Sequence, residues 1–311
     1  MRRFRPCVIS CVVAAATGCT HPPASRGSAP LAASATLSLW PGAPAGRGRS
    51  LERPPDPVRG AITRVTDITD PTLTVYRPTA ARTGGAPAVL VFPGGGYQYL
   101  AVDIEGTDVC GWLTQIGVAC VLVRYRVPQP ADATRSAQPL QDAQRALALV
   151  RRNAPQWGID ARRVGVLGFS AGAHVAALLS VRTGGRTYAP VDAADDEPLR
   201  PDFAMLLYPA YLVRGRGDPR LATDVQPTST TPPTFLVQTA DDGVGAENSL
   251  QYALALRGAN VPVELHLFPT GGHGYGLRAA VGEVAVAWPR LARRWLIGRG
   301  VVPAASEAAG R

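Results

Sequence analysis

The clearest chemical signal in the chain is a serine held between two glycines. Residues 168–172 read Gly-Phe-Ser-Ala-Gly, between an apolar run at 164–167 and a segment rich in Ala and Leu. Small flanking residues permit a tight strand-to-helix turn, which lifts the Ser170 hydroxyl above the sheet and points the helix N-terminus at it. A bare Gly-x-Ser-x-Gly also occurs as a turn with a capping serine. The strand before it and the helix after it favour a nucleophile.

A serine hydroxyl attacks only with the help of a base that is itself oriented. The chain has 4 histidines. His21 lies in a Pro-rich segment, His174 stands one helical turn beyond the serine, and His266 is inside an apolar run, so a structural role suits each of them better. His273 instead stands between glycines just after the last apolar run, where a loop brings an imidazole to the edge of a sheet. We therefore predict His273 as the base.

The acid that orients this base is expected after the apolar run at 234–237. Two neighbours, Asp241 and Asp242, stand there. We choose Asp242, because it precedes apolar Val244 by two residues, a spacing that many serine hydrolases use. Asp241 remains the competitor, with the other of the pair serving as a turn or cap residue.

Attack on an ester creates an oxyanion that backbone N–H groups must receive. Residues 92–97 read Phe-Pro-Gly-Gly-Gly-Tyr and end the first apolar run. The absence of side chains permits close approach, so we predict Gly95 and Gly96 as donors, with the N–H of Ala171 directly after the nucleophile as their partner. The alternative for the glycine triplet is simple loop flexibility.

Alternating strands and helices must position these loops. Continuous apolar runs indicate a parallel sheet covered on both faces, and they occupy 88–92, 119–123, 164–167, 203–207, 234–237 and 263–267. Helical patterns occupy 107–116, 140–153, 171–181, 247–257 and 284–297. Ahead of them, 62–69 and 72–76 alternate as half-buried antiparallel strands do. The pattern predicts an α/β fold with a mostly parallel sheet and helices on both faces.

The motifs together resemble bacterial α/β-hydrolases related to acetyl xylan and feruloyl esterases. The resemblance covers about residues 60–298 and includes residues 93–97, Glu105-Gly106, Tyr125-Arg126, Asp142, residues 168–174, 247–249 and 271–276. It implies the α/β-hydrolase fold, with the triad in the chain order Ser, acid, His and with no metal or cofactor. Two departures are Pro93, where lipase-like relatives have His, and Gly245-Ala246, which lack the usual Val-Pro after the acid.

The expected function is that of a serine carboxylesterase acting on short acyl esters, acetyl above all, of carbohydrates such as xylan. Residues 209–233 are rich in Pro, Thr, Gly and Arg, too short and polar for an apolar helical lid. An uncovered site favours short acyl groups. The alternatives are a general small-molecule carboxylesterase, a peptidase-related hydrolase, and a glycan-binding surface lipoprotein on a hydrolase scaffold.

The N-terminus predicts export. Arg2, Arg3 and Arg5 precede a largely apolar run at 7–16, which is typical of a secretory signal peptide. The following Ala-Thr-Gly-Cys resembles a lipobox, so we predict lipidation of Cys19, with ordinary cleavage near 14–16 as the alternative. The expected product is a periplasmic or cell-envelope lipoprotein, or else a secreted protein. The predicted parts are a signal peptide at 1–19, a Pro/Gly-rich linker at 20–60, a catalytic domain at 61–298 and a flexible tail at 299–311.

Composition excludes other classes of protein. The net charge of +9 rests on 32 basic residues, all of them Arg and scattered along the chain, which does not fit a nucleic-acid groove. The sequence contains no His pair at ligand spacing and no Cys-x-x-Cys, so it predicts no metal site. The sequence leaves the oligomeric state open. Cys110 and Cys120, on a predicted helix and the next strand, are expected to be two separately buried thiols.

Overall fold

The computed structural model describes most of the chain from residue 31 onward. The described residues are 31–42, 48–79, 83–132, 134–182, 184–215, 217–278 and 282–304. The predicted signal peptide, its Cys19 and the last residues of the predicted tail lie outside them. None of the helices in the described residues has the length and apolar character needed to cross a membrane.

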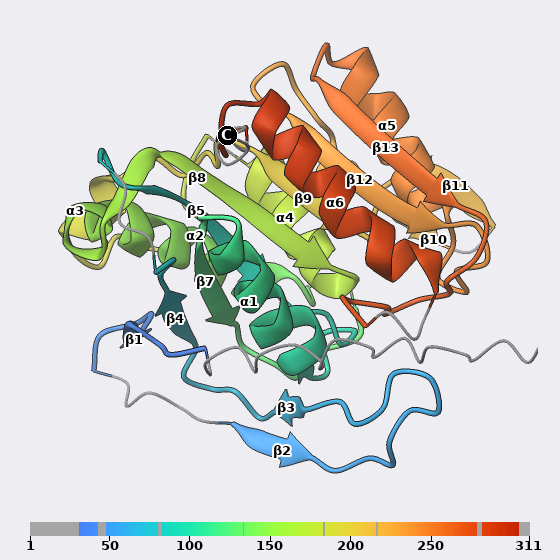
Figure 1. Cartoon of the computed structure of the whole chain (residues 1–311), viewed down its shortest axis with the longest axis horizontal. Helices are drawn as coiled ribbons and strands as arrows, with labels where there is room; N and C mark the ends of the chain where they lie inside the picture. The colour runs from blue at the N-terminus through green and yellow to red at the C-terminus, as the bar shows by residue number, and fades with distance from the viewer. Residues whose placement is uncertain are drawn as a thin grey trace, which may run out of the picture. The chain divides into compact units, whose positions relative to one another are not determined.

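The domain is built on an eight-stranded sheet with the strand order β1-β4-β7-β5-β8-β9-β12-β13 (Figure 1). The strand bounds are β1 (Ala35–Ser38), β4 (Thr72–Tyr76), β5 (Ala86–Phe92), β7 (Ala119–Arg124), β8 (Ile159–Phe169), β9 (Ala204–Leu207), β12 (Thr234–Thr239) and β13 (Val263–Phe268). Strand β4 pairs antiparallel with both β1 and β7, whereas every pair from β7 to β13 is parallel. The carboxyl ends of the parallel strands therefore meet at one edge, where the motif-bearing loops lie.

Helices cover both faces of this sheet. Buried apolar residues form two clusters, one on each face of the sheet. The cluster on one face includes residues of α1 (Asp108–Gln115) and α6 (Glu283–Gly298), as Figure 1 shows for the helices. The opposite face carries α2 (Ala137–Arg152), α3 (Ala154–Trp157), α4 (Ala171–Val181) and α5 (Glu247–Gly258). Strand residues alternate between the two clusters, as the pleat requires: Leu90 belongs to one and Val91 to the other. The predicted α/β architecture is confirmed.

Shorter elements surround the carboxyl edge. A three-stranded sheet consists of β2 (Arg49–Leu51), β3 (Arg64–Thr66) and β6 (Leu100–Ala101), and a hairpin consists of β10 (Val213–Gly215) and β11 (Asp218–Leu221). Short helical turns are η1 (Asp103–Thr107), η2 (Ala193–Asp196) and η3 (Thr223–Val225). The strand predicted at 62–69 is thus shorter and lies outside the main sheet. The polar segment at 209–233 forms the hairpin rather than a helical lid.

The linker predicted at 20–60 is wrong from Ala35 onward, because strands β1 and β2 lie within it. Strand β1 pairs with β4 along its whole length, and Leu39 is 1% exposed. The Nε of Arg145 donates to the Leu39 carbonyl at 2.9 Å, and the indole of Trp40 donates to Asp142 at 2.8 Å. The high Pro and Gly content of the segment concealed two short strands, β1 and β2, and the buried leucine that follows β1. The flexible tail predicted at 299–311 also begins too early, because Val302 is buried against the domain.

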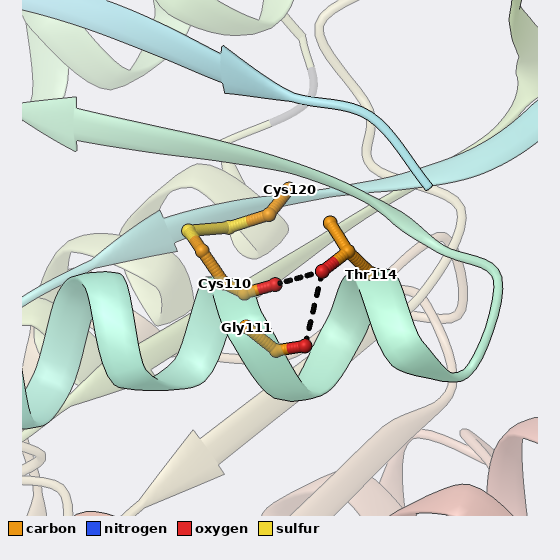
Figure 2. The surroundings of a disulfide bond; sticks show 4 residues. All are labelled: Cys110, Gly111, Thr114 and Cys120. Atoms are coloured by element: carbon orange, nitrogen blue, oxygen red, sulfur yellow. Dashed lines mark hydrogen bonds between the residues drawn. A yellow bond between two sulfur atoms is a disulfide. The ribbon is translucent and has the colours of Figure 1, made fainter. Parts of the chain in front are cut away.

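The prediction of two separate thiols is also wrong, because Cys110 and Cys120 form a disulfide (Figure 2). Cys110 lies on α1 and Cys120 on β7, with their Cα atoms 5.1 Å apart. Helix α1 packs directly on β7, so its buried face meets the start of that strand. Thr114 donates to the carbonyl oxygens of Cys110 and Gly111, which fixes the last helical turn beside the bridge. The disulfide therefore ties α1 to the sheet.

Replacing both cysteines by alanine (Cys110→Ala with Cys120→Ala) should lower the free energy of unfolding by about 2–3 kcal/mol, because the bridge restricts the unfolded chain. Urea unfolding with and without a reductant measures the change. Reductant should destabilise the wild-type protein and leave the double variant unaffected, which serves as the matched control. Reaction of Cys110 and Cys120 with a thiol reagent in the unreduced, denatured wild-type protein, located by peptide mapping, would contradict the bridge.

Candidate active site

Ser170 stands at a sharp turn between β8 and α4. Its backbone has φ 51° and ψ −117°, a left-handed conformation that is uncommon for a residue with a side chain. The two glycines around it allow close packing. A Cβ on Gly168 would lie 2.3 Å from the Gly172 carbonyl oxygen, and one on Gly172 would lie 2.0 Å from the Phe92 carbonyl oxygen. The strand, turn and helix that the motif predicts are therefore present, and only glycine fits on both sides.

The structure brings Ser170, His273 and Asp242 together in one chain of hydrogen bonds. The Oγ of Ser170 lies 2.7 Å from His273 Nε2, and His273 Nδ1 lies 2.8 Å from Asp242 Oδ2. The second carboxylate oxygen of Asp242 accepts the N–H of Val244 at 2.7 Å. The Asp242 side chain is 0% exposed and that of His273 is 28% exposed. A buried acid thus orients a base that solvent and substrate reach.

Asp241, the competing acid, points elsewhere. Its carboxylate accepts the N–H groups of Gly272 at 2.8 Å and Gly271 at 3.2 Å. These backbone donors, Gly272 first, lower the pKa of Asp241. Asp241 therefore holds the backbone just before His273 rather than its imidazole. Asp241 thus fixes the loop backbone, and Asp242 orients the imidazole ring.

The predicted oxyanion donors line the same cleft as the serine. Gly95 and Gly96 border that cleft with Ser170. Within the described part of the chain, the N–H groups of Gly95, Gly96 and Ala171 donate to no protein acceptor. Gly95 has φ 139°, and a Cβ there would lie 2.0 Å from the Tyr99 carbonyl oxygen. The loop therefore requires glycine, and its free N–H groups are available to a ligand.

Glu105 is a buried carboxyl beside the glycine loop, and the sequence motifs do not predict a role for it. Its Oε2 accepts the Gly94 N–H at 2.7 Å, and its Oε1 accepts the Tyr208 hydroxyl at 2.8 Å. Burial raises the pKa of Glu105, and the bonds from Tyr208 and Gly94 act against that rise. The Tyr208 ring lies 5.0 Å from the His273 ring. Glu105 therefore connects the glycine loop to the tyrosine beneath the base, and the Glu105-Gly106 pair in the sequence was the available signal.

His174 has the structural role that the sequence predicts. Its Nδ1 lies 2.7 Å from the Tyr97 hydroxyl, and its Nε2 lies 3.8 Å from the Asp224 carboxylate. Burial lowers the pKa of His174 to about 4, so the ring is neutral at neutral pH. Its backbone N–H bonds to the Ser170 carbonyl oxygen at 3.2 Å, which helps to close the turn.

The cleft above these residues is large, and both polar and apolar residues line it. It has a volume of about 1,320 Å³ and is lined by Ser170, His273, the glycine loop, and residues of the β10–β11 hairpin and the three-stranded sheet. Within the described ranges, no cluster of three or more His, Cys, Asp or Glu side chains could hold a metal ion. The arrangement is suited to acyl transfer through the serine.

Comparisons with known proteins agree on the kind of protein. Residues 73–196 match the family BD-FAE. The acetylxylan esterase of Xylanibacter ruminicola is 30% identical over 212 residues, which cover 61% of this chain and 41% of that protein. The carboxylesterase NlhH of Mycobacterium tuberculosis is 28% identical over 274 residues, covering 78% and 77%. The chain thus spans only about two fifths of the acetylxylan esterase.

A solved structure gives a broader match. The acetyl ester-xyloside bifunctional hydrolase from Caldicellulosiruptor lactoaceticus is 32% identical, with a TM-score of 0.70, and the match covers 88% of this chain and 100% of that one. An identity of 32% over the whole length of a solved hydrolase indicates membership of the same family and not only a shared fold. The chain belongs to the family of bacterial α/β-hydrolases related to acetylxylan and feruloyl esterases.

Proposed function

We propose that the protein is a serine carboxylesterase that removes acetyl and other short acyl groups from carbohydrates such as xylan. One observation carries the proposal: an uninterrupted chain of hydrogen bonds runs from Ser170 through His273 to buried Asp242 and opens into a large cleft. The names of the acetylxylan esterase and the acetyl ester-xyloside hydrolase among its relatives support the carbohydrate ester as substrate.

In the first half of the reaction, Ser170 Oγ forms a bond to the ester carbonyl carbon while His273 Nε2 takes its proton. The carbonyl oxygen becomes an oxyanion, which the N–H groups of Gly95, Gly96 and Ala171 receive. When the tetrahedral species collapses, the bond to the alcohol oxygen breaks and His273 returns the proton to that oxygen. Asp242 keeps Nδ1 protonated and stabilises the imidazolium throughout.

In the second half, water replaces the alcohol. His273 takes a proton from the water as its oxygen attacks the acyl carbon, and the same N–H groups receive the second oxyanion. The bond to Ser170 Oγ then breaks, and the serine recovers its proton from His273. The products are the free acid and the regenerated hydroxyl, with no cofactor consumed.

The walls of the cleft favour a short acyl group. The β10–β11 hairpin that borders it contributes Val213, Arg214, Gly215, Gly217 and Pro219. A long acyl chain gains its binding free energy from buried apolar surface, at about 25 cal/mol per Å². The hairpin stands where an apolar helical lid would enclose such a chain, so a long chain stays largely in contact with water and an acetyl group loses the least binding free energy.

A second candidate is a general carboxylesterase acting on small esters. The match to NlhH, over 78% of this chain, favours it. Its chemistry is the same, and the two candidates differ in the alcohol portion of the ester. Activity on acetylated oligosaccharides separates them.

We also propose that the protein is exported and anchored through a lipidated Cys19, or cleaved as an ordinary secreted protein. The basic and apolar character of residues 1–19 supports export. The Cys110–Cys120 disulfide gives independent support, because such bridges persist in oxidising compartments outside the cytosol.

The two neighbouring aspartates should differ sharply in their effect on turnover. Asp242→Asn should lower kcat by up to about 10⁴-fold, because the amide favours the wrong tautomer of His273. Asp241→Asn keeps a carbonyl acceptor for the backbone donors and should lower kcat far less. Steady-state kinetics with p-nitrophenyl acetate ranks the pair, and a larger loss in Asp241→Asn would transfer the role to Asp241.

The wild-type protein should release acetate from acetylated xylan and cleave p-nitrophenyl acetate with a kcat/KM that falls steeply by the C8 ester, because a short hairpin, and not an apolar helical lid, borders the cleft. Ser170→Ala should abolish both activities and prevent labelling by a fluorophosphonate. Faster cleavage of the octanoate, with acetylated xylan untouched, would favour the general carboxylesterase. Undiminished activity in Ser170→Ala would exclude the serine mechanism.

Mass spectrometry of the membrane fraction should find a mature N-terminus at Cys19 carrying acyl chains, since the Ala-Thr-Gly-Cys sequence resembles a lipidation signal and acyl chains anchor a protein to a membrane. Cys19→Ser should move the protein to the soluble fraction. An unmodified soluble form that begins at another residue would remove the lipoprotein assignment.

A further inference from the structure

The cleft around Ser170 carries an excess of positive charge. Four arginines that line it form no ion pair with a carboxylate within the described part of the chain: Arg53, Arg64, Arg135 and Arg214. The lining carboxylates do not balance them. Asp56 is paired with Arg59 at 3.0 Å, and Glu105 is buried with its own donors, which leaves the exposed Glu247. Such a cleft attracts anions and concentrates them at its mouth.

Two tyrosines hold three of these guanidinium groups close to the glycine loop. The Arg53 and Arg64 guanidinium carbons lie 5.2 and 5.7 Å from the centre of the Tyr99 ring. The Arg135 guanidinium carbon lies 4.8 Å from the centre of the Tyr211 ring. Each contact is a cation–π interaction that orients the guanidinium without neutralising it.

Both tyrosines lie against the glycines that would receive the oxyanion. The Tyr99 carbonyl oxygen is 2.0 Å from a Cβ built on Gly95, and the Tyr211 hydroxyl is 3.9 Å from a Cβ built on Gly96. The positive groups therefore surround the place where the ester would sit. They come from separate elements, with Arg64 on β3 of the three-stranded sheet and Arg135 just before α2.

We propose that the natural ester carries a carboxylate in its alcohol portion, as in an acetylated oligosaccharide that bears a uronate. The inference rests on the proposed esterase function and specifies its substrate class. An oriented guanidinium offers paired N–H donors that match a carboxylate, which a neutral sugar lacks. The acetyl group fills a small part of a 1,320 Å³ cleft, so the charged group belongs to the larger, sugar side of the ester.

The test compares two substrates that differ in one carboxyl group. The first is an acetylated xylo-oligosaccharide with a glucuronate branch, and the second is the same compound with the carboxyl reduced to an alcohol. The intact full-length protein should cleave the charged compound with a kcat/KM about 10-fold higher or more, since hydrogen bonds to a charged group are the stronger ones. That ratio should fall as salt rises, because added ions screen the attraction.

Variants assign the effect to the cleft. Arg53→Gln and Arg135→Gln should each reduce the charged-to-neutral ratio several-fold, and together they should bring it near 1. Arg220→Gln is the matched control, because Arg220 does not line the cleft and is paired with Asp218 at 2.7 Å. It should leave the ratio unchanged. Two single variants on different elements guard against misfolding of either one.

The outcomes separate this inference from the function on which it rests. If p-nitrophenyl acetate is cleaved and the wild-type ratio is 1, the carboxylate assignment is wrong and the esterase function stands. A preference for mono-p-nitrophenyl succinate over the acetate, without a gain from the uronate, would place the charge on the acyl side and overturn the proposal. If no ester is cleaved, both fail.

Discussion

The buried carboxyl of Glu105 holds the candidate site together. It accepts the N–H of Gly94 on one side and the hydroxyl of Tyr208 on the other. The same hydroxyl accepts the Gly276 N–H at 3.2 Å, three residues beyond His273. Loops from three parts of the chain thus meet at one carboxyl. Removing it would leave buried donors without an acceptor, which costs more than the bonds themselves contribute.

The order of the strands explains why such a connection is needed. Strands β9 and β12 lie between β8, which precedes the serine, and β13, which precedes the histidine loop. The imidazole must therefore reach back across the ends of β12 and β9 to meet Ser170. Tyr208, which follows β9 with φ 37°, supports the imidazole with its ring. A strained backbone at this point keeps the ring beneath the base while its hydroxyl reaches Glu105.

The sequence predicted what depends on pattern and missed what depends on packing. Apolar runs such as 88–92 identify the parallel strands because both faces of that sheet are buried, and the glycines around Ser170 predict its turn. Strand β1 was missed because Pro and Gly surround it. The disulfide was missed because spacing alone does not say which way two cysteine side chains point. Asp242 was preferred over Asp241 on spacing, but only the fold shows that Asp242 faces the imidazole and Asp241 the backbone.

Strand β13 is the last strand of the sheet, at the end opposite β1. Within the described residues one of its edges pairs with β12 and the other pairs with no strand. Its free edge could pair with the same edge of another copy and extend the sheet between molecules. Glu264 and His266 stand on this strand 2.7 Å apart, and Arg294 of α6 lies 3.5 Å from Glu264. Two copies joined along this edge would bring these charged groups together and strip them of water. Charged side chains on an edge strand are one of the ways in which proteins disfavour such pairing.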